Sequence, residues 1–275
     1  MLLKKKPNFI KILIYSIIIS SLFSCQKTFD YSVYSAYVPV EYRATRLINL
    51  EKLTHKETDS TNNNKVCFAL LSDSHSYFDD LEDAVLAINK DKDVELILLG
   101  GDITDGGMLD EYLIFRFIME QSEVPYFSVI GNHDCLANGY TIYQEIYGTD
   151  DYVLVYKDCK FIFFNDIVWE LNNREPDYFW LKEQLTNTNS EENLFVLAHI
   201  APFSDSFSPL QRYAYTSLMD TNNVLLSIHG HHHQHYYGEY YNDSVMYMNI
   251  GSVDKRYYIK ITVENKTYDM ERVRF

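Results

Sequence analysis

Residues 66–75 read Val-Cys-Phe-Ala-Leu-Leu-Ser-Asp-Ser-His, and residues 94–105 read Val-Glu-Leu-Ile-Leu-Leu-Gly-Gly-Asp-Ile-Thr-Asp. Each stretch is an apolar run of strand length that ends in small and acidic residues. A continuous apolar run is typical of a strand that is buried on both faces, as in a sheet covered by helices. Between the two runs, Leu81–Asn89 has the spacing of an amphipathic helix. These stretches therefore predict a strand–helix–strand unit of an α/β fold.

The same alternation of strands and helices continues along the rest of the chain. Further helices are predicted over Leu109–Gln121 and Pro176–Leu185, the second with proline in its first turn. Further strands are predicted over Pro125–Ile130, Tyr152–Tyr156, Phe161–Asn165, Leu194–Ala198, Val224–Ile228, Met246–Ile250 and Tyr257–Val263. Roughly 210 residues are enough for one sizeable core. We therefore expect a single α/β domain over residues 66–275.

Short polar clusters follow five of the predicted strands. They are Asp73-Ser74-His75, Gly101-Asp102-Ile103-Thr104-Asp105, Gly131-Asn132-His133-Asp134, a single His199, and Gly230-His231-His232-His233. Side chains at the same ends of neighbouring strands meet in space even when they are far apart in sequence. Asp, Asn and His side chains form the ligand set of a hydrolytic site with two metal ions. The sequence therefore predicts a metal centre at one edge of the sheet.

In this order the clusters resemble the calcineurin-like metallophosphoesterase family. The family pattern is Asp-x-His, Gly-Asp, Gly-Asn-His-Asp/Glu, a lone His and then Gly-His-x-His, and all five parts occur here. The resemblance extends from Val66 to about Ser252. It implies a four-layer α/β sandwich with two central mixed sheets flanked by helices, whereas the alternation of elements alone predicts only an α/β fold.

The resemblance also implies a role for each matching residue. One metal ion would be held by Asp73, His75, Asp102 and His233, and the other by Asp102, Asn132, His199 and His231, so that Asp102 bridges them. His133 would not bind metal but would give a proton to the leaving oxygen, with Asp105 orienting it and Asp134 supporting the loop. Divalent or trivalent Mn, Fe, Zn and Ni ions all accept such ligands.

The implied reaction is hydrolysis of a phosphate monoester, diester or phosphoanhydride by a water that bridges the two ions. A phosphoryl centre is anionic and repels hydroxide, and two cations offset this repulsion and lower the pKa of bound water toward about 7. A poor alkoxide leaving group needs a proton, which histidine is suited to give near neutral pH. We expect substrate selection in two loops, Leu136–Gly148 and Ser204–Asp220.

The histidine-rich tract at residues 229–235 leaves alternatives open. His229 and His235 have the same parity as His231 and His233, and they would face the site if the segment stayed extended. We expect both to lie behind the ligands or at the surface, with His232 pointing the other way. The tyrosines that follow form either an aromatic wall that stacks a nucleobase or a Tyr-rich strand surface, in a chain with 24 tyrosines.

The same residues are also compatible with roles outside catalysis. Asp73 and Asp105 could be helix N-caps, since a helix is predicted after each of them. A non-catalytic binding module could keep the fold without the chemistry, although such a module has no need of His133. A metal-scavenging protein built around the histidine tract would bind metal without the ligands outside residues 229–235.

The N-terminus predicts export. Residues 1–24 have a charged beginning with Lys4, Lys5, Lys6 and Lys11, followed by an apolar run over Ile12–Phe23 that is too short to span a bilayer comfortably. The segment ends Leu22-Phe23-Ser24-Cys25, which resembles a bacterial lipobox and implies a lipid on Cys25. We therefore expect a membrane-anchored protein on the extracytoplasmic, periplasm-facing side of a bacterial envelope, with residues 25–65 as a partly disordered tether.

Charge and cysteine content restrict the partners. The net charge is −15, and removal of residues 1–24 takes away four lysines and no acidic residue. A field of this sign repels polyanions, so nucleic acid is not expected as a partner, while a small phosphorylated molecule or a lipid head group is. With Cys25 lipidated, only Cys67, Cys135 and Cys159 remain, which gives no disulfide framework.

Overall fold

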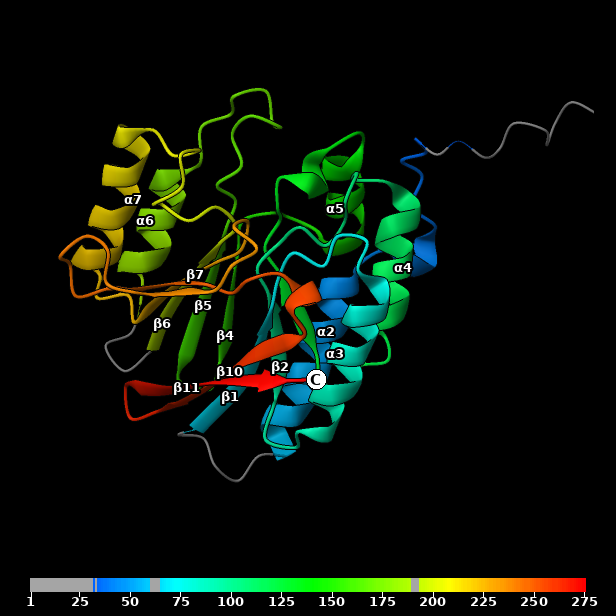
Figure 1. Ribbon diagram of the computed structural model, residues 1–275, viewed down its shortest axis with the longest axis horizontal. Helices are drawn as coiled ribbons and strands as arrows, with labels where there is room; N and C mark the ends of the chain where they lie inside the picture. Colours follow the sequence, from blue (N-terminus) through cyan, green and yellow to red (C-terminus); the bar gives the residue numbers. More distant parts are fainter. Residues whose placement is uncertain (1–31, 33, 60–64, 189–192) are drawn as a thin grey trace, which may run out of the picture.

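The computed structural model describes residues 32, 34–59, 65–188 and 193–275. Its strands form two sheets that lie face to face, with helices on the outer side of each (Figure 1). This is the four-layer α/β sandwich with two central mixed sheets that the family resemblance implies. Each predicted strand is present, with its ends moved by at most two residues.

The first sheet has the strand order β11-β10-β1-β2-β3. Its strands are β1 (Lys65–Leu71), β2 (Leu96–Leu99), β3 (Tyr126–Ser128), β10 (Tyr257–Glu264) and β11 (Thr267–Arg274). β1, β2 and β3 run parallel, and β10 is antiparallel to both β1 and β11. Consequently the carboxyl ends of β1, β2 and β3 lie at the same edge of this sheet.

The second sheet has the strand order β4-β5-β6-β7-β9-β8. Its strands are β4 (Tyr152–Tyr156), β5 (Cys159–Phe164), β6 (Asn193–Ala198), β7 (Leu226–His229), β8 (Tyr236–Gly238) and β9 (Met246–Asn249). β5, β6, β7 and β9 are parallel to one another, and the outer strands β4 and β8 are antiparallel to their neighbours. The carboxyl ends of β6 and β7 therefore also share one edge.

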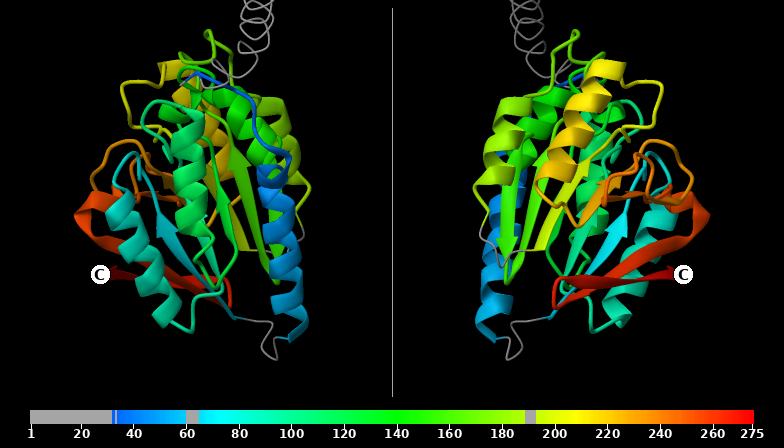
Figure 2. Two further views of the ribbon diagram at one scale, coloured as in Figure 1. Left: turned by 90° about the vertical axis from the view of Figure 1, so that its right-hand side faces the viewer. Right: turned by 90° about the vertical axis from the view of Figure 1, so that its left-hand side faces the viewer.

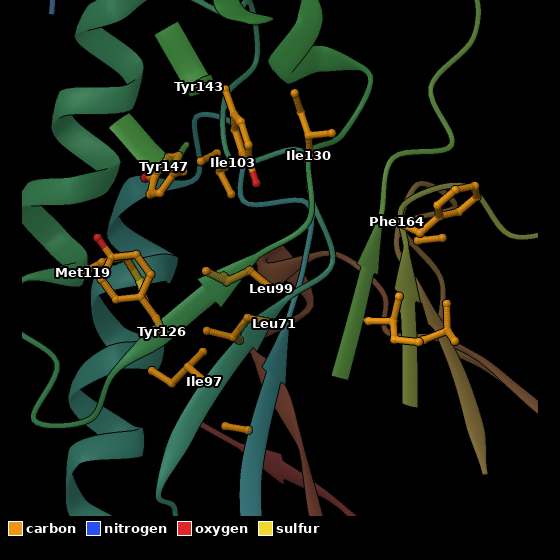
Figure 3. Close-up of a cluster of buried hydrophobic side chains, with 14 of the residues drawn as sticks. Leu71, Ile97, Leu99, Ile103, Met119, Tyr126, Ile130, Tyr143, Tyr147 and Phe164 are labelled. Atoms are coloured by element: carbon orange, nitrogen blue, oxygen red, sulfur yellow. The ribbon is translucent and has the colours of Figure 1, made fainter. Parts of the chain in front are cut away.

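Alternate residues of the strands face two different parts of the core. Phe68, Phe161 and Phe195 belong to the cluster between the sheets, where their rings contact one another edge to face or stacked. Leu71 and Leu99 point the other way, toward helices α3 (Phe78–Lys90) and α4 (Leu109–Met119) (Figure 3). This period of two, with both faces apolar, explains why the strands read as continuous apolar runs.

Helices cover the outer face of each sheet (Figures 1 and 2). On the first sheet lie α3, α4 and α5 (Gly139–Tyr147), and on the second lie α6 (Tyr178–Thr186) and α7 (Pro209–Thr221). α5 and α7 occupy the two segments that we predicted as substrate loops, so that prediction is wrong for most of their length. The buried face of α5 includes Ile142 and Ile146, whose burial stabilises a helix rather than a loop.

The predicted tether over residues 25–65 is also wrong in its second half. Residues Thr45–Asp59 form helix α2, which packs on β3 and α5. Leu53 is buried between the sheets, and Asn49 Oδ1 accepts a hydrogen bond from the backbone N–H of Tyr126 at 3.0 Å. The helix thus supplies an apolar contact and satisfies a buried donor, and the folded domain begins well before residue 66.

Several expectations for the N-terminus lie outside the described residues. These include the signal segment 1–24 and the proposed lipidation site Cys25. In the described ranges no helix is long and apolar enough to span a membrane. The three cysteines found there are buried and unpaired.

Candidate metal centre

The five polar clusters meet between the two sheets, at the carboxyl ends of their strands. Asp73 and His75 follow β1, Asp102 follows β2, and Asn132 and His133 follow β3. From the second sheet, His199 follows β6, while His231 and His233 follow β7. The structure therefore brings together all seven side chains that we predicted as metal ligands. Two of them, Asp73 and His233, lie far apart in the sequence.

One group of donor atoms is formed by Asp73, His75 and His233, whose ligand atoms all lie within 4.8 Å of one another. His75 Nε2 is 3.1 Å from His233 Nε2, and His233 Nε2 is 3.5 Å from Asp73 Oδ1. Side chains from two different clusters thus converge on one point. This is the set predicted for one metal ion, apart from the shared Asp102.

A second group is formed by Asp102, His199 and His231, again within 4.8 Å. Asn132 joins it, because its Oδ1 is 3.1 Å from both His199 Nε2 and His231 Nδ1. Asp102 Oδ2 lies 3.2 Å from His199 Nε2 and 3.7 Å from His75 Nε2 of the first group. Asp102 therefore stands between the two groups, as a carboxylate that bridges two cations must.

The hydrogen bond on the far side of His199 fixes which nitrogen faces this centre. His199 Nδ1 donates to the backbone carbonyl of Gly100 at 2.7 Å, because a carbonyl oxygen can only accept. Nε2 is then the nitrogen that faces Asp102 and Asn132. Histidine ligands of metals are commonly oriented by such a bond from their other nitrogen.

The negative charge of two buried carboxylates at the centre favours bound cations. Asp73 and Asp102 are buried, with 0% and 1% of their surface exposed, and their ion pairs among the described residues are with histidines only. Burial raises the pKa of Asp73 to about 6. Burial opposes ionisation of Asp102 too, but the neighbouring histidines, with His199 foremost, hold its pKa at about 2. Two carboxylates in so dry a place need positive charge beside them.

When no metal ion is bound, a protonated histidine supplies the positive charge beside the two carboxylates. Burial alone would lower the pKa of His199, but the Asp102 and Asp73 carboxylates raise it to about 10. Burial lowers the pKa of His75, and it lowers that of His231 to about 4. Neutral imidazole is the form that binds metal. Oxygen and nitrogen donors in this arrangement fit metal ions that accept mixed ligands.

The backbone at the centre is strained. Asp73, His75, Asp102, His231 and His233 all have a positive φ, between 43° and 72°. For a residue with a Cβ atom this left-handed conformation costs about 1–2 kcal/mol, and it persists where the surrounding structure enforces it. Five of the seven predicted ligands share it, so the fold holds these side chains in place at the expense of stability.

Glycines allow the strand ends to approach one another. A Cβ atom on Gly131 would collide with the backbone nitrogen and the Oδ1 atom of Asp102. Gly101 has a φ of +96°, and a Cβ atom there would meet Nδ1 of His199 at 2.6 Å. The Gly-Asp and Gly-Asn parts of the pattern thus have a steric reason.

His133 and Asp105 lie beside the centre and contact each other in an unexpected way. His133 Nδ1 donates to the backbone carbonyl of Asp105 at 2.7 Å, while the Asp105 carboxylate is 3.8 Å from that nitrogen. The carboxylate lies somewhat closer to His75 Nδ1, at 3.5 Å. The backbone N–H of His133 donates to Asp102 Oδ1 at 2.9 Å. Asp105 is therefore adjacent to His133, but the carboxylate is not what orients it here.

The structure excludes helix capping by the two aspartates and gives Asp134 a clear role. The N-caps of α3 and α4 are Tyr77 and Met108, so neither Asp73 nor Asp105 caps a helix. Asp134 is buried and accepts hydrogen bonds from the backbone N–H groups of Ile103, Thr104 and Gly131. It ties the second and third clusters together, which is the supporting role predicted for it.

The histidine tract does not continue as a strand beyond β7. His231 and His233 have φ values of 72° and 52°, so the parity argument for His229 and His235 does not apply. His229 is fully buried and binds Ser227 Oγ and the carbonyl of Ala198, and His235 Nδ1 donates to the carbonyl of Asn249. His232 stacks on Phe203 at 5.7 Å. These three histidines lie outside both groups of donor atoms.

Sequence reasoning missed a cavity of about 280 Å³ that opens beside the second group of ligands. Asn132 and His231 form part of its wall, together with Asp166, Trp169 and Glu170 from the segment after β5. Glu170 Oε1 accepts from Asn132 Nδ2 at 3.3 Å. A signal for this segment existed, because Asn165 and Asp166 directly follow a buried strand, as each predicted ligand cluster does.

Comparison with known proteins agrees with this geometry. The sequence pattern of calcineurin-like phosphoesterases matches residues 68–235, which is more than half of the chain and includes all five polar clusters. The chain belongs to the calcineurin-like phosphoesterase family. The conclusion rests on the matched sequence and agrees with the convergence of the ligands.

Two bacterial relatives are named as probable cyclic nucleotide phosphodiesterases. The one from Fibrobacter succinogenes is 25% identical over 171 residues, which cover 61% of this chain and 64% of that protein. The one from Xenorhabdus bovienii is 36% identical over 70 residues, which cover 25% of this chain and 28% of that protein. The chain thus spans less than two thirds of the length of either relative.

Two solved structures of phosphatases share the fold. A dimetal phosphatase from Danio rerio matches with a TM-score of 0.59 and 14% identity, over 76% of this chain and 96% of that one. A purple acid phosphatase from yellow lupin seeds matches with a TM-score of 0.59 and 13% identity, over 76% of this chain and 51% of that one. At such identities the similarity concerns the architecture alone.

Proposed function

We propose that this chain hydrolyses a phosphate mono- or diester, or a phosphoanhydride, at a centre of two metal ions. The observation that carries the proposal is the convergence of seven donor side chains in two groups, with Asp102 between them. Asp73, His75 and His233 would hold one ion and Asn132, His199 and His231 the other, with Asp102 shared. When bound, two such ions neutralise phosphoryl oxygens and lower the pKa of water.

The chain's own residues supply the proton for the leaving group. The hydrogen bond from His133 Nδ1 to the Asp105 carbonyl fixes the orientation of the ring and leaves Nε2 available for the proton given to the leaving oxygen. His133 is partly exposed, and its ring centroid lies 4.6 Å from that of His75 at the first ligand group. One ligand atom of His133 also lies within 4.8 Å of ligand atoms of His75 and Asp105, so its role as proton donor rather than metal ligand rests on the family resemblance.

Two observations bear on the choice of substrate and on the alternatives. The names of the bacterial relatives support a diester, such as a cyclic nucleotide, as the finer assignment. A scavenger built on the histidine tract is disfavoured, because only His231 and His233 of that tract join the ligand groups, beside residues from four other strand ends. A non-catalytic module on the same fold is the remaining alternative.

The test is hydrolysis of a panel of phosphate mono- and diesters, with Mn, Zn and Fe supplied separately. We expect turnover of at least one ester with at least one metal. A protein that binds two metal ions per chain and turns over no ester would support the non-catalytic module instead.

We further propose that the protein is anchored by a lipid on Cys25 at the extracytoplasmic face of a bacterial envelope. The support is the charged and apolar segment over residues 1–24 and the Leu-Phe-Ser-Cys sequence at its end. Labelling with a radioactive fatty acid tests this proposal. We expect label in the wild type and none in Cys25→Ala, and equal labelling of both would exclude Cys25 as the anchor.

A further inference from the structure

The cavity beside Asn132 and His231 has a volume of about 280 Å³, and two carboxyl groups form part of its wall. Asp166 and Glu170 both line it, and no lysine or arginine is among the described residues that do. Because Asn132 and His231 belong to the second ligand group, a phosphoryl group bound at that centre would place one of its substituents at the mouth of the cavity. The cavity is thus a site for the organic part of a substrate.

Only one oxygen of the Asp166 carboxyl group accepts a hydrogen bond from a described residue. Its Oδ2 accepts from the backbone N–H of Ile200 at 3.0 Å, while Oδ1 is buried without a hydrogen-bond partner among the described residues. The hydroxyl of Tyr178, which also lines the cavity, is buried and unpartnered in the same sense. Buried polar atoms are costly when they make no hydrogen bond. A ligand that donates to Asp166 would remove that cost.

The rest of the wall is aromatic. Trp169, Tyr178 and Phe207 line the cavity, and Trp169 is 67% exposed while Phe207 is buried. The faces of aromatic rings attract cations and planar groups, and their effect adds to that of nearby carboxylates. Acidic and aromatic groups together favour an amine, and they repel a second phosphate or a carboxylate.

We propose that this cavity binds the organic group of the substrate and selects one that carries an amine over one that carries an acid. Asp166 Oδ1 accepts from the amine, the aromatic rings contact its carbon skeleton, and Glu170 adds negative charge near Asn132. This inference rests on the proposed phosphoesterase function, because it assumes that the phosphoryl group sits at the ligand groups.

Three matched phosphonates test this selection. We would use 4-(aminomethyl)-, 4-methyl- and 4-carboxybenzylphosphonate, which differ only in the group at the far end of one rigid arm. Each would compete with bis(p-nitrophenyl) phosphate in the metal-loaded protein. We expect the aminomethyl compound to inhibit about tenfold more strongly than the methyl compound, and the carboxyl compound about tenfold more weakly, since a desolvated ionic or cation–π contact has that size.

A second readout does not depend on turnover. The chain has two tryptophans, so replacing Trp180 with phenylalanine leaves Trp169 as the sole tryptophan. Quenching of Trp169 in the metal-loaded protein then reports binding of each phosphonate directly. If no ester is hydrolysed but the three compounds still differ in binding, the proposed function fails and the assignment of the cavity stands.

Three variants test which side chain causes the preference for the amine. In Asp166→Asn the amide oxygen must stay with the Ile200 N–H, so the amide nitrogen replaces the spare acceptor and the preference for the amine should vanish. Glu170→Gln keeps an oxygen for Asn132 Nδ2 and should weaken the preference through loss of charge alone. Glu183→Gln, on the exposed side of α6, is the control for a lost charge and should keep the full preference.

The outcomes separate clearly. Equal binding of the three phosphonates, or tighter binding of the carboxyl compound, would overturn the proposal. If Asp166→Asn does not fold, an unchanged preference in Glu170→Gln would overturn the part that assigns the selection to the two carboxyl groups of the wall.

Discussion

His133 Nδ1 donates to the backbone carbonyl of Asp105 at 2.7 Å, while the carboxylate of Asp105 lies 3.8 Å from that nitrogen. The main chain therefore orients the proton donor. We expect His133→Ala to keep its bound metal, since the backbone N–H that donates to Asp102 remains, and to lose about 10²–10⁴-fold in kcat, the usual contribution of a general acid.

The companion variant Asp105→Asn leaves the carbonyl in place and should lose less than about tenfold in kcat. Metal content per chain, measured beside kcat, is the control for both variants. A loss of metal in His133→Ala would make His133 a ligand, and a loss of activity in Asp105→Asn as large as in His133→Ala would return the role to the carboxylate.

The left-handed backbone at His233 predicts an unusual order of stability. His233→Gly and His233→Ala both remove the imidazole, but only glycine adopts a φ of 52° without strain. In chelator-treated protein we expect the Gly variant to be more stable than the Ala variant by about 1 kcal/mol. Chemical denaturation measures the difference. His232, whose φ is not in that region, is the matched control, and there Gly should be no more stable than Ala.

Helix α2 contributes to the core of the domain. Leu53 is 3% exposed and lies between the sheets, whereas Leu47 of the same helix is 60% exposed. We expect Leu53→Ala to lower the free energy of unfolding by about 2–4 kcal/mol, as for other buried leucines, and Leu47→Ala to lower it by less than about 0.5 kcal/mol. Similar small effects of both would mean that residues before 66 are a tether after all.

The partly buried carboxyl of Asp151 predicts a pH dependence of stability. Burial raises its pKa to about 6, above the value of about 3.8 for an exposed group, and its Oδ1 accepts from the backbone N–H of Asn165. Because the folded state holds the proton more tightly, its contribution to stability is present below pH 3.8 and is lost as the pH rises through about 6.

Asp151→Asn keeps the acceptor and removes the charge. Relative to wild type, the variant should gain about 2 kcal/mol of stability between pH 4 and pH 7. Denaturation at several pH values checks this, and a difference that does not change with pH would contradict it.

The parts of the fold that can be predicted from the sequence are those with a simple pattern of apolar residues. Apolar runs such as Leu96–Leu99 predict the strands, because residues buried on both faces are apolar at every position. The sequence predicts a loop where helix α7 lies, although Ser208 and Gln211 form a capping box and Pro209 stands in the first turn. That local signal was present, but polar residues in the helix obscured its apolar stripe.

The sequence predicts which side chains converge at the centre but not what surrounds them. The ligands follow strand ends in a fixed order, which made each of them visible in the sequence. Asp166 follows a strand end but falls outside the fixed order of the five clusters, and the place of Glu170 depends on how the segment after β5 folds back against Asn132. The left-handed φ values of Asp73 and His231 likewise follow from tertiary contacts, such as the bond from His231 N to Asp73 Oδ1.

The most direct measurement is turnover of bis(p-nitrophenyl) phosphate as metal is added back, equivalent by equivalent, to chelator-treated protein. With Asp102 shared between two ions, activity should rise until two metal ions are bound per chain and then stay constant. Turnover that does not depend on metal, activity that is complete with one ion, or a protein that binds two ions and remains inactive toward this and every other ester would contradict the account.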